Sequence, residues 1–351
     1  MYLDPSRTQS SEQNSEYPSR DLLSRPLRDL RLSVLDRCNL RCTYCMPADS
    51  LNGKGIFLPK GCLLVDQEIT QLVRIFSQLG VNKVRLTGGE PLLRPGFTDL
   101  VSMIAEVGAI TDLALTTNAI LLPKFAESLF AAGLGRITVS LDSLDEAIFQ
   151  RMSGGRGSVV EVLEGIEAAE SAGFVSIKIN TVVQRGVNDE CVTDLIEHFR
   201  GTGHTVRLIE FMDVGNLNHW SQDQVVPSAE LLKRIHELWP LRPVAQQGRG
   251  ETARRYEYLD GAGEIGFISS ISEPFCGDCS RARITADGVF YNCLFSSSGT
   301  ELRSLLRSGI GHSELLEFIR SLWLSRDARY SEARDPLGRN RPKVEMFRVG
   351  G

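Results

Sequence analysis

Two hydrophobic patterns alternate along most of the chain. Short runs of β-branched and aliphatic residues are each followed by a longer segment whose apolar positions recur every three to four residues. The runs that predict strands are 31–35, 83–87, 112–116, 136–140, 175–183 and 205–211. The segments that predict helices include 67–79, 97–107, 123–132, 159–172 and 190–200. Six strand–helix units in series predict a parallel sheet with its helices on the outside.

Polar residues gather where the predicted strands end, at 87–90, 116–118, 140–142 and 210–213. Barrel enzymes build their sites at the carboxyl ends of parallel strands. This placement therefore favours an α/β fold with a partial (β/α)6 TIM-type barrel, although a doubly wound sheet would also fit the alternation. Six units are too few for a closed barrel of eight.

The pattern changes near residue 246. Short strands are expected at 255–259, 264–269, 284–285 and 289–292, and two helices at 300–309 and 312–324. This shift predicts a smaller C-terminal α+β domain. Residues 1–20 are polar and lack an apolar period, which predicts a disordered tail. The expected organisation is a tail at 1–20, a barrel at 21–245 and a second, smaller domain at 246–351.

Composition narrows the class of protein. The 351 residues carry 39 Lys and Arg against 44 Asp and Glu, a formal charge of −5. No run approaches the roughly 18 apolar residues of a membrane-spanning helix, and the polar N-terminus lacks the apolar core of a signal peptide. We therefore expect a cytoplasmic protein with no membrane partner. The slight acidity argues against a nucleic-acid partner and leaves room for a small anionic ligand.

The cysteines are more informative than the charge. Six of the eight form two tight groups: Cys38, Cys42 and Cys45, then Cys276, Cys279 and Cys293. In a long chain without a signal peptide, clustered thiols indicate metal binding or redox chemistry in a reducing compartment. Cys62 and Cys191 stand alone and are interpreted as small buried side chains.

The first group has the spacing C-x3-C-x2-C and directly follows the first predicted strand. Three thiolates this close can each bind one iron of a [4Fe–4S] cluster, which leaves the fourth iron open for a chelating substrate. A zinc knuckle is the alternative, but no fourth ligand follows at a suitable spacing.

This pattern, with Tyr44 before the last cysteine, closely resembles the radical S-adenosylmethionine superfamily. Gly88-Gly89-Glu90-Pro91 after the second strand is similar to that superfamily's GGEP motif, which binds the methionine amino group. Glycines there would let the backbone approach a ligand, and Glu90 could pair with an ammonium.

The second group has the spacing C-x2-C-x13-C and again offers three thiolates. A zinc ribbon short of one ligand and a purely structural cluster remain alternatives. Arg281 and Arg283 follow Cys279 closely, and guanidinium groups bind phosphate oxygens in a bidentate manner, so an anion pocket is expected. Taken alone, two such residues are more often solvated surface.

From about residue 21 to 351 the chain resembles the molybdenum cofactor biosynthesis protein A family, the GTP 3′,8-cyclases. The matching stretches are DLRLSVLDRCNLRCTYCMP, KVRLTGGEPLLR, LTTN, ITVSLDS, KINTVVQRGVND, RLIEFMDVGN, FCGDCSRARIT and the terminal Gly350-Gly351. The resemblance implies that each cysteine group holds a [4Fe–4S] cluster. It also implies an S-adenosylmethionine site formed by Tyr44, Gly89, Ser140 and Met212. The GTP contacts that it implies are Arg31, Arg85, Thr116, Lys178, Arg281, Ala282 and Arg283, with Arg281 and Arg283 also as catalytic candidates.

The implied reaction converts GTP into (8S)-3′,8-cyclo-7,8-dihydroguanosine 5′-triphosphate, the first step of molybdopterin cofactor biosynthesis. It would need S-adenosylmethionine and an electron donor, and a homodimer is left open. The terminal glycines could enter a crowded site, since they lack Cβ atoms, or could simply be a loose chain end. Two rival functions remain: a peptide-modifying radical enzyme with an auxiliary cluster, and a non-enzymatic iron–sulfur scaffold.

Overall fold

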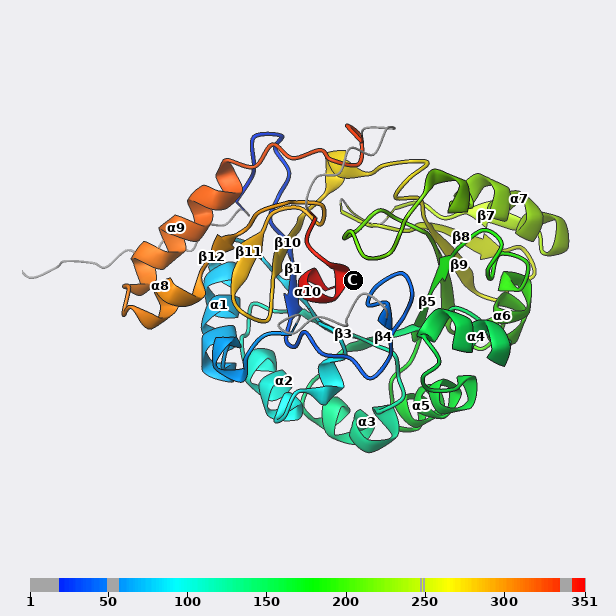
Figure 1. The fold of residues 1–351 in the computed structure, drawn as a ribbon, viewed down its shortest axis with the longest axis horizontal. Coiled ribbons are helices and arrows are strands. Elements are labelled where there is room, and N and C mark those ends of the chain that lie inside the picture. Colours follow the sequence, from blue (N-terminus) through cyan, green and yellow to red (C-terminus); the bar gives the residue numbers. More distant parts are fainter. Residues whose placement is uncertain (1–18, 49–56, 247, 249, 335–342, 351) are drawn as a thin grey trace, which may run out of the picture.

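The protein is described by a computed structural model that covers residues 19–48, 57–246, 248, 250–334 and 343–350. Within these residues, a twelve-stranded sheet runs in the order β12-β11-β10-β1-β2-β3-β4-β5-β6-β9-β8-β7. The sheet curves around a central space, and helices cover its outer face (Figure 1). The expected α/β fold with a partial barrel is confirmed.

The first six strands are β1 (Asp29–Ser33), β2 (Lys83–Thr87), β3 (Asp112–Thr117), β4 (Arg136–Ser140), β5 (Lys178–Val183) and β6 (Thr205–Glu210). The helices between them are α1 (Asp66–Gln78), α2 (Phe97–Ala105), α3 (Leu122–Ala131), α4 (Glu146–Ser153), α5 (Val159–Ser171) and α6 (Val192–Phe199). Each strand pairs in parallel with the next. The predicted alternation is therefore confirmed, with ends that differ by a few residues.

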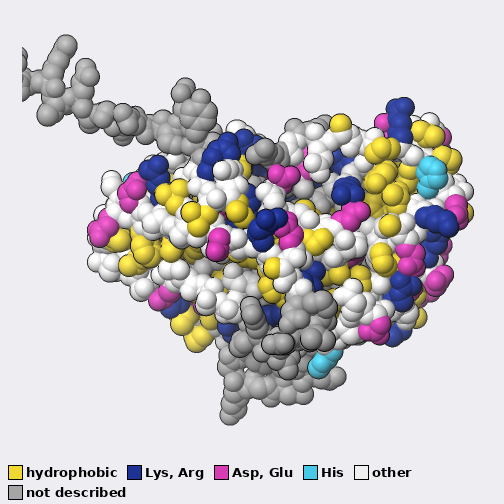
Figure 2. All heavy atoms as spheres, turned by 90° about the horizontal axis from the view of Figure 1, so that it is seen from above, with side chains coloured by type: hydrophobic (Ala, Val, Ile, Leu, Met, Phe, Trp, Pro, Cys, Tyr) yellow, Lys and Arg dark blue, Asp and Glu magenta, His cyan; other side chains and the backbone are white. Residues whose placement is uncertain are grey.

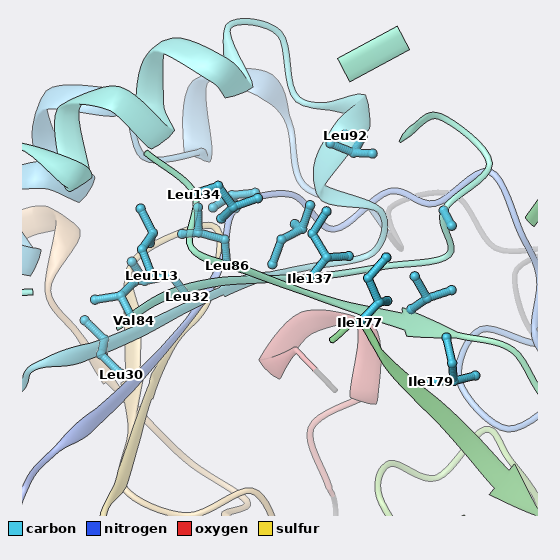
Figure 3. Packing of buried hydrophobic residues seen from close by; sticks show 14 of the residues in the cluster. Leu30, Leu32, Val84, Leu86, Leu92, Leu113, Leu134, Ile137, Ile177 and Ile179 are labelled. Atoms are coloured by element: carbon cyan, nitrogen blue, oxygen red, sulfur yellow. The ribbon is translucent and has the colours of Figure 1, made fainter. Parts of the chain in front are cut away.

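Side chains on each strand divide between the two faces of the sheet. On the outer face, Leu30 and Leu32 of β1 and Val84 and Leu86 of β2 are at most 1% exposed and join the hydrophobic cluster beneath the helices (Figure 3). The register pairs Arg31 with Arg85, so these alternate residues share the inner face. The strand pattern thus places apolar residues under the helices and cations inside the barrel.

Strands from the C-terminal third extend this parallel sheet at both edges. β9 (Glu264–Ile268) pairs in parallel with β6, and β10 (Arg281–Ile284) pairs in parallel with β1. Four further strands add antiparallel edges: β7 (Leu241–Pro243) and β8 (Arg254–Tyr258) beyond β9, and β11 (Val289–Tyr291) and β12 (Thr300–Glu301) beyond β10. The sheet crosses the expected boundary at 245, and the division into two domains stays a prediction.

Some elements carry weak sequence signals. The eight-residue α4 is too short for a clear apolar period, and its ends are fixed by a hydrogen bond from the Ile148 amide to the Asp145 carboxylate and by Gly154 at φ 71°. The remaining helices are α7 (Ser228–Leu238), α8 (Arg303–Arg307), α9 (His312–Leu324) and α10 (Met346–Val349). Of these, α7 and α10 were not expected.

The outer surface carries both signs of charge. Basic and acidic side chains are interspersed on the face shown in Figure 2. Across the described residues, no helix combines the length and the apolar character needed to cross a bilayer. The expected tail at 1–20 lies outside the described residues except for its last two positions, where the Ser19 amide donates to the Leu79 carbonyl at 2.9 Å.

Candidate active site

A cavity of about 670 Å³ fills the centre of the barrel and contains both cysteine groups. The sequence-predicted residues that line it are Arg31, Cys38, Cys42, Tyr44, Cys45, Arg85, Gly89, Thr116, Ser140, Lys178, Met212, Cys276, Cys279, Arg281, Arg283 and Cys293. Segments more than 200 residues apart in the sequence therefore meet in one chamber. Ala282 is not among the lining residues, because its side chain is fully buried in the hydrophobic core.

The first cysteine group lies on the loop after β1. Backbone bonds from Arg41 to Ser153 and from Thr43 to Met152, both 2.9 Å, fix this loop to the end of α4. Burial, and after it the Glu90 carboxylate, raises the pKa of the Cys38 thiol to about 11. Such thiols become thiolates when a metal displaces their protons, as iron–sulfur ligands must.

Gly88 and Gly89 pack directly against the backbone that leads to Cys38. The Gly89 amide donates to the Leu35 carbonyl at 2.7 Å. A Cβ on Gly88 would overlap the Leu35 carbonyl oxygen, and one on Gly89 would overlap that of Arg37. The glycines are therefore required for contact between two loops, a reason different from the close approach to a ligand that the sequence suggested.

Glu90 joins the ends of β2 and β3. Its carboxylate is 1% exposed and accepts hydrogen bonds from the Leu92 amide at 3.1 Å, the Thr117 hydroxyl at 2.8 Å and the Asn118 amide at 2.9 Å. Burial raises the pKa of Glu90 to about 7 despite these bonds. Asn118 also donates to Asn39 at 2.8 Å, so this network reaches the first cysteine loop.

Tyr44 is held across the cavity by a residue that the sequence did not single out as a ligand. Its hydroxyl donates to the Asp142 carboxylate at 2.8 Å. Burial raises the pKa of Asp142 to about 6. The signal available in the sequence was the position of Asp142 just after β4, two residues beyond Ser140.

A group of buried cations lies on the inner face of the strands. Burial, followed by Arg281 and Arg85, lowers the pKa of Arg31 to about 9. Burial and neighbouring cations lower the pKa of Lys178 to about 7 and that of Arg85 to about 10. Arg85 also donates to the hydroxyls of Thr116 and Thr138 at 2.9 Å.

Arg207 belongs to the same group and was missed. It lines the cavity, and burial followed by Arg136 lowers its pKa to about 10. Its signal was the repetition of VRL in β6 and β2, which places Arg207 and Arg85 at the same position of their strands. Like charges collected in a buried chamber favour an anionic ligand, because an anion offsets both their repulsion and their desolvation.

The second cysteine group lies beside Arg281 and lines the same chamber. Cys276 begins a short 3-10 helix, Cys276–Asp278, and Cys279 follows it. Burial raises the pKa of the Cys279 thiol, but Arg281 and then Arg326 outweigh this effect and lower it to about 6. The Arg281 guanidinium also lies over the Phe275 ring at 5.0 Å.

Arg283 binds the end of the chain. It is 4% exposed, and its Nη1 donates to the carbonyls of Val349, at 3.0 Å, and Gly350. Gly350 has φ 71°, and a Cβ there would overlap the Thr87 hydroxyl. Figure 1 shows α10 and the C-terminus at the centre of the barrel opening. Gly351 lies outside the described residues.

The thiols that line the cavity are soft metal ligands. No three His, Cys, Asp or Glu side chains of the described residues are grouped so that they could hold one metal ion. All eight cysteines are free thiols, and six of them line the cavity as two groups of three. A [4Fe–4S] cluster takes one thiolate for each iron, which fits such groups of soft ligands.

Two family models match consecutive parts of the chain. The Radical SAM superfamily matches residues 32–199, and Molybdenum Cofactor Synthesis C matches residues 204–332. The barrel with its cysteine loop therefore defines a protein of the radical S-adenosylmethionine class, which implies one [4Fe–4S] cluster and S-adenosylmethionine.

Curated relatives narrow this class. The GTP 3′,8-cyclase of Xanthomonas axonopodis pv. citri is 53% identical over 334 residues, 95% of this chain and 99% of the relative. That of Acidothermus cellulolyticus is 49% identical over 321 residues, 90% of this chain and 89% of the relative. The chain belongs to the GTP 3′,8-cyclase family, as its resemblance predicted.

Solved structures agree on the fold. Streptococcus suis SuiB superposes with a TM-score of 0.58 at 16% identity, over 89% of this chain and 68% of SuiB. The anSMEcpe structure with bound AdoMet gives a TM-score of 0.58 at 15% identity, over 91% of this chain and 94% of that chain. At these identities the likeness concerns the fold alone.

Proposed function

We propose that this protein converts GTP into (8S)-3′,8-cyclo-7,8-dihydroguanosine 5′-triphosphate, the first step of molybdenum cofactor biosynthesis. The observation that carries the proposal is the group of buried cations Arg31, Arg85, Lys178 and Arg207, which lines one cavity together with both cysteine groups. A triphosphate supplies the negative charge that this group favours.

Cys38, Cys42 and Cys45 would hold the first cluster, with S-adenosylmethionine bound near Tyr44, Gly89, Ser140 and Met212. When bound, the cluster would supply one electron to S-adenosylmethionine, whose cleavage would give methionine and a 5′-deoxyadenosyl radical able to take hydrogen from ribose C3′. Tyr44 is held by Asp142, and the cysteine loop by Gly88, Gly89 and α4, so the chain keeps this side of the cavity rigid.

Cys276, Cys279 and Cys293 would hold a second [4Fe–4S] cluster whose open iron meets the guanine ring. Arg31, Arg85, Thr116 and Lys178 would bind the phosphates, and the strand carrying Arg281, Ala282 and Arg283 would form the adjoining wall. Because Ala282 is buried in the core, its part in binding would be limited to its backbone.

The chain must also keep water and reductants away from the reacting carbons. Figure 1 shows α10 at the centre of the barrel opening, and Arg283 donates to the carbonyl of Val349 at the end of α10, an arrangement that suits this task. We therefore assign Arg283 to holding the tail beside the substrate and Arg281 to the second cysteine group.

A cytoplasmic location and an external electron donor complete the proposal. Eight free thiols suit a reducing compartment. The interspersed surface charges give no reason to add a nucleic-acid partner. A homodimer stays open.

The test is product formation by the reconstituted enzyme under anaerobic conditions with dithionite, S-adenosylmethionine and GTP. We expect 5′-deoxyadenosine and a cyclised nucleotide in equal amounts. 5′-Deoxyadenosine that forms equally without GTP, with no new nucleotide, would favour another substrate such as a peptide. Its absence under all conditions would favour a scaffold without enzymatic activity.

A further inference from the structure

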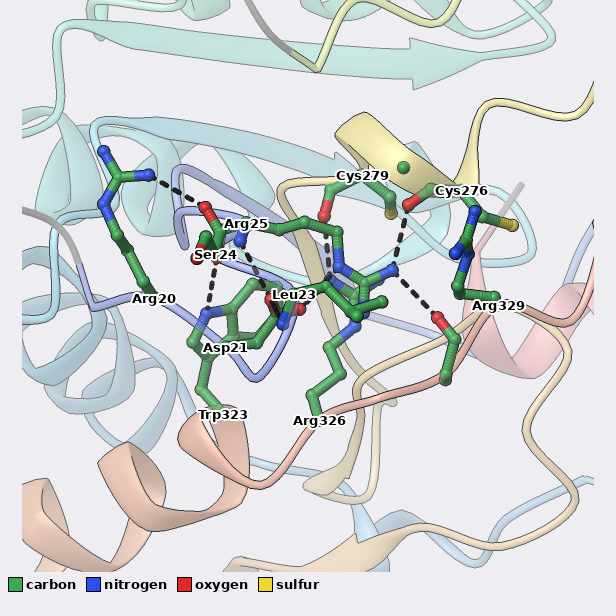
Figure 4. A network of polar contacts seen from close by, with 12 residues as sticks. Arg20, Asp21, Leu23, Ser24, Arg25, Cys276, Cys279, Trp323, Arg326 and Arg329 are labelled. Carbon is green, nitrogen blue, oxygen red and sulfur yellow. Dashed lines mark hydrogen bonds and ion pairs between the residues drawn. The ribbon is translucent and has the colours of Figure 1, made fainter.

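A buried ionic network lies against the second cysteine group (Figure 4). Asp21 and Arg25 come from the segment before β1, and Arg326 follows α9. Their exposed fractions are 6%, 2% and 2%. Charged side chains are seldom buried this completely unless the charges are paired or serve a site, so the position calls for a physical explanation.

One carboxylate serves both arginines. Asp21 accepts Nε of Arg25 at 2.6 Å and Nη1 of Arg326 at 3.1 Å. It also accepts the backbone amides of Leu23 and Arg25, at 3.0 and 2.9 Å. The two guanidinium groups and the one carboxylate together carry a net positive charge, and all three side chains are buried.

The arginines hold the backbone of two cysteines. Arg25 Nη1 donates to the carbonyls of Cys276 and Ala328, both at 2.9 Å. Arg326 Nη1 donates to the carbonyl of Cys279 at 2.8 Å. The positions of these two cysteines are therefore fixed by side chains from the two opposite ends of the chain.

Both arginines retain bonding capacity. Among the described residues, Nη2 of Arg25 and Nε of Arg326 are buried without a hydrogen-bond partner. Arg326 lines the cavity beside Cys279. Buried N–H groups without partners are rare in native proteins, and here they accompany surplus positive charge beside three thiols.

We propose that Arg25 and Arg326 are positioning residues for the second cluster, which fix its cysteine loop and raise its reduction potential, while Asp21 limits that increase. The inference rests on the second cluster of the proposed function. Positive charge near an iron–sulfur cluster favours the reduced form, which carries one more electron, and negative charge opposes it.

The test uses the full chain with Cys38, Cys42 and Cys45 changed to Ala, so that only the second cluster is present. Iron is counted, and the midpoint potential is measured by a redox titration with dithionite, followed by electron paramagnetic resonance. Arg326→Gln and Arg25→Gln should shift the potential to more negative values, and Asp21→Asn to more positive values. Arg326→Lys, which keeps the charge, should restore most of the Arg326→Gln shift.

Arg320→Gln is the matched control, because Arg320 lies on α9 with a half-exposed side chain paired to Glu317. It should leave the potential unchanged. A merely structural role would not give shifts of opposite sign for the Asp and Arg variants. If the Gln variants bind no iron, Asp21→Asn still tests the sign, and Arg326→Lys, which keeps the charge, should leave the potential nearly unchanged.

Equal potentials in all iron-loaded variants would overturn this inference and leave the second cluster intact. A protein with the three barrel cysteines changed that binds no iron at all would instead overturn the second cluster of the proposed function. The iron count therefore separates the two failures.

Discussion

The cations inside the barrel favour an anionic ligand. Arg31 and Lys178 stand on separate strands, and burial together with neighbouring positive charges lowers the pKa of each. A bound triphosphate would raise these pKa values towards their ordinary range, because it replaces repulsion with attraction. Binding and protonation should therefore be linked at these residues.

Lys178 makes that linkage measurable near neutral pH. Its pKa in the ligand-free protein is about 7, and a bound anion raises it. The protonated form binds the anion better, so GTP affinity should be greatest below pH 7 and fall by up to about 10-fold per unit as the pH rises above 7. Isothermal titration calorimetry in buffers of different ionisation enthalpy should record proton uptake near pH 8.

Lys178→Arg provides the control for that experiment, since its guanidinium does not titrate in this range. Its proton uptake should be much smaller, while any contribution from the phosphate groups of GTP remains. Equal uptake by the two proteins would remove Lys178 from the phosphate site.

Arg31→Gln should separate binding from stability. Loss of a charge-assisted hydrogen bond should weaken GTP binding by about 10- to 100-fold. Removal of one buried cation from a like-charged group should also raise the melting temperature of the ligand-free protein. Unchanged affinity, measured by calorimetry, would show that the phosphates lie elsewhere.

At the scale of elements, the C-terminal segment is the part of the fold whose contacts point most clearly to a role in the reaction. The four-residue α10 delivers Gly350 to the end of β2, where Thr87 leaves no room for a Cβ. Arg283 of β10 fixes the segment through two backbone carbonyls. Productive chemistry should therefore require a seated tail.

Gly350→Ala should block that seating, because alanine disfavours φ 71° and its Cβ meets Thr87. Cyclisation should be lost or strongly reduced while the protein stays folded and keeps its iron. Deletion of residues 350 and 351 should have the same effect. Turnover is measured by chromatography of the nucleotide products.

Gly309→Ala is the matched control for the tail variant. Gly309 has φ 78°, but a Cβ at this position would meet no atom of the described residues within 4 Å, so only local strain is added. Normal turnover by Gly350→Ala would show that the tail is a passive chain end.

Local sequence signals predicted most elements but not their long-range pairing. The hydrophobic period marks β1 to β6 and the helices α1, α2, α3, α5 and α6, because each depends on neighbouring residues. It could not place β9 and β10 at the two edges of one sheet, since that pairing joins segments far apart in the chain. The short α4 and α10 were missed for lack of a full apolar period, whereas the 11-residue α7 has Leu231 and Ile235 at helical spacing and was overlooked.

The same difference between local sequence signals and long-range contacts explains which features of the site could be predicted. The cysteines and most of the cations were found from motif spacing and resemblance, and the structure gathers them in one cavity. The binding of the tail by Arg283 and the network around Arg326 depend on contacts between distant segments. No local sequence pattern predicts such contacts.

For the whole molecule, the cavity between two separate cysteine groups predicts a definite iron content. Anaerobic reconstitution should load about eight irons per chain, and loss of Cys38, Cys42 and Cys45 together should leave about four. Cys62→Ala and Cys191→Ala serve as controls and should change neither number. About four irons in the unaltered protein would contradict a second cluster.

The central claim is that this chamber holds GTP with ribose C3′ beside the radical source. It is tested most directly with GTP deuterated at C3′ under single-turnover conditions. Mass spectrometry should find the deuterium in 5′-deoxyadenosine and not in the cyclised nucleotide. A cyclised nucleotide that forms while 5′-deoxyadenosine stays unlabelled would contradict the claim.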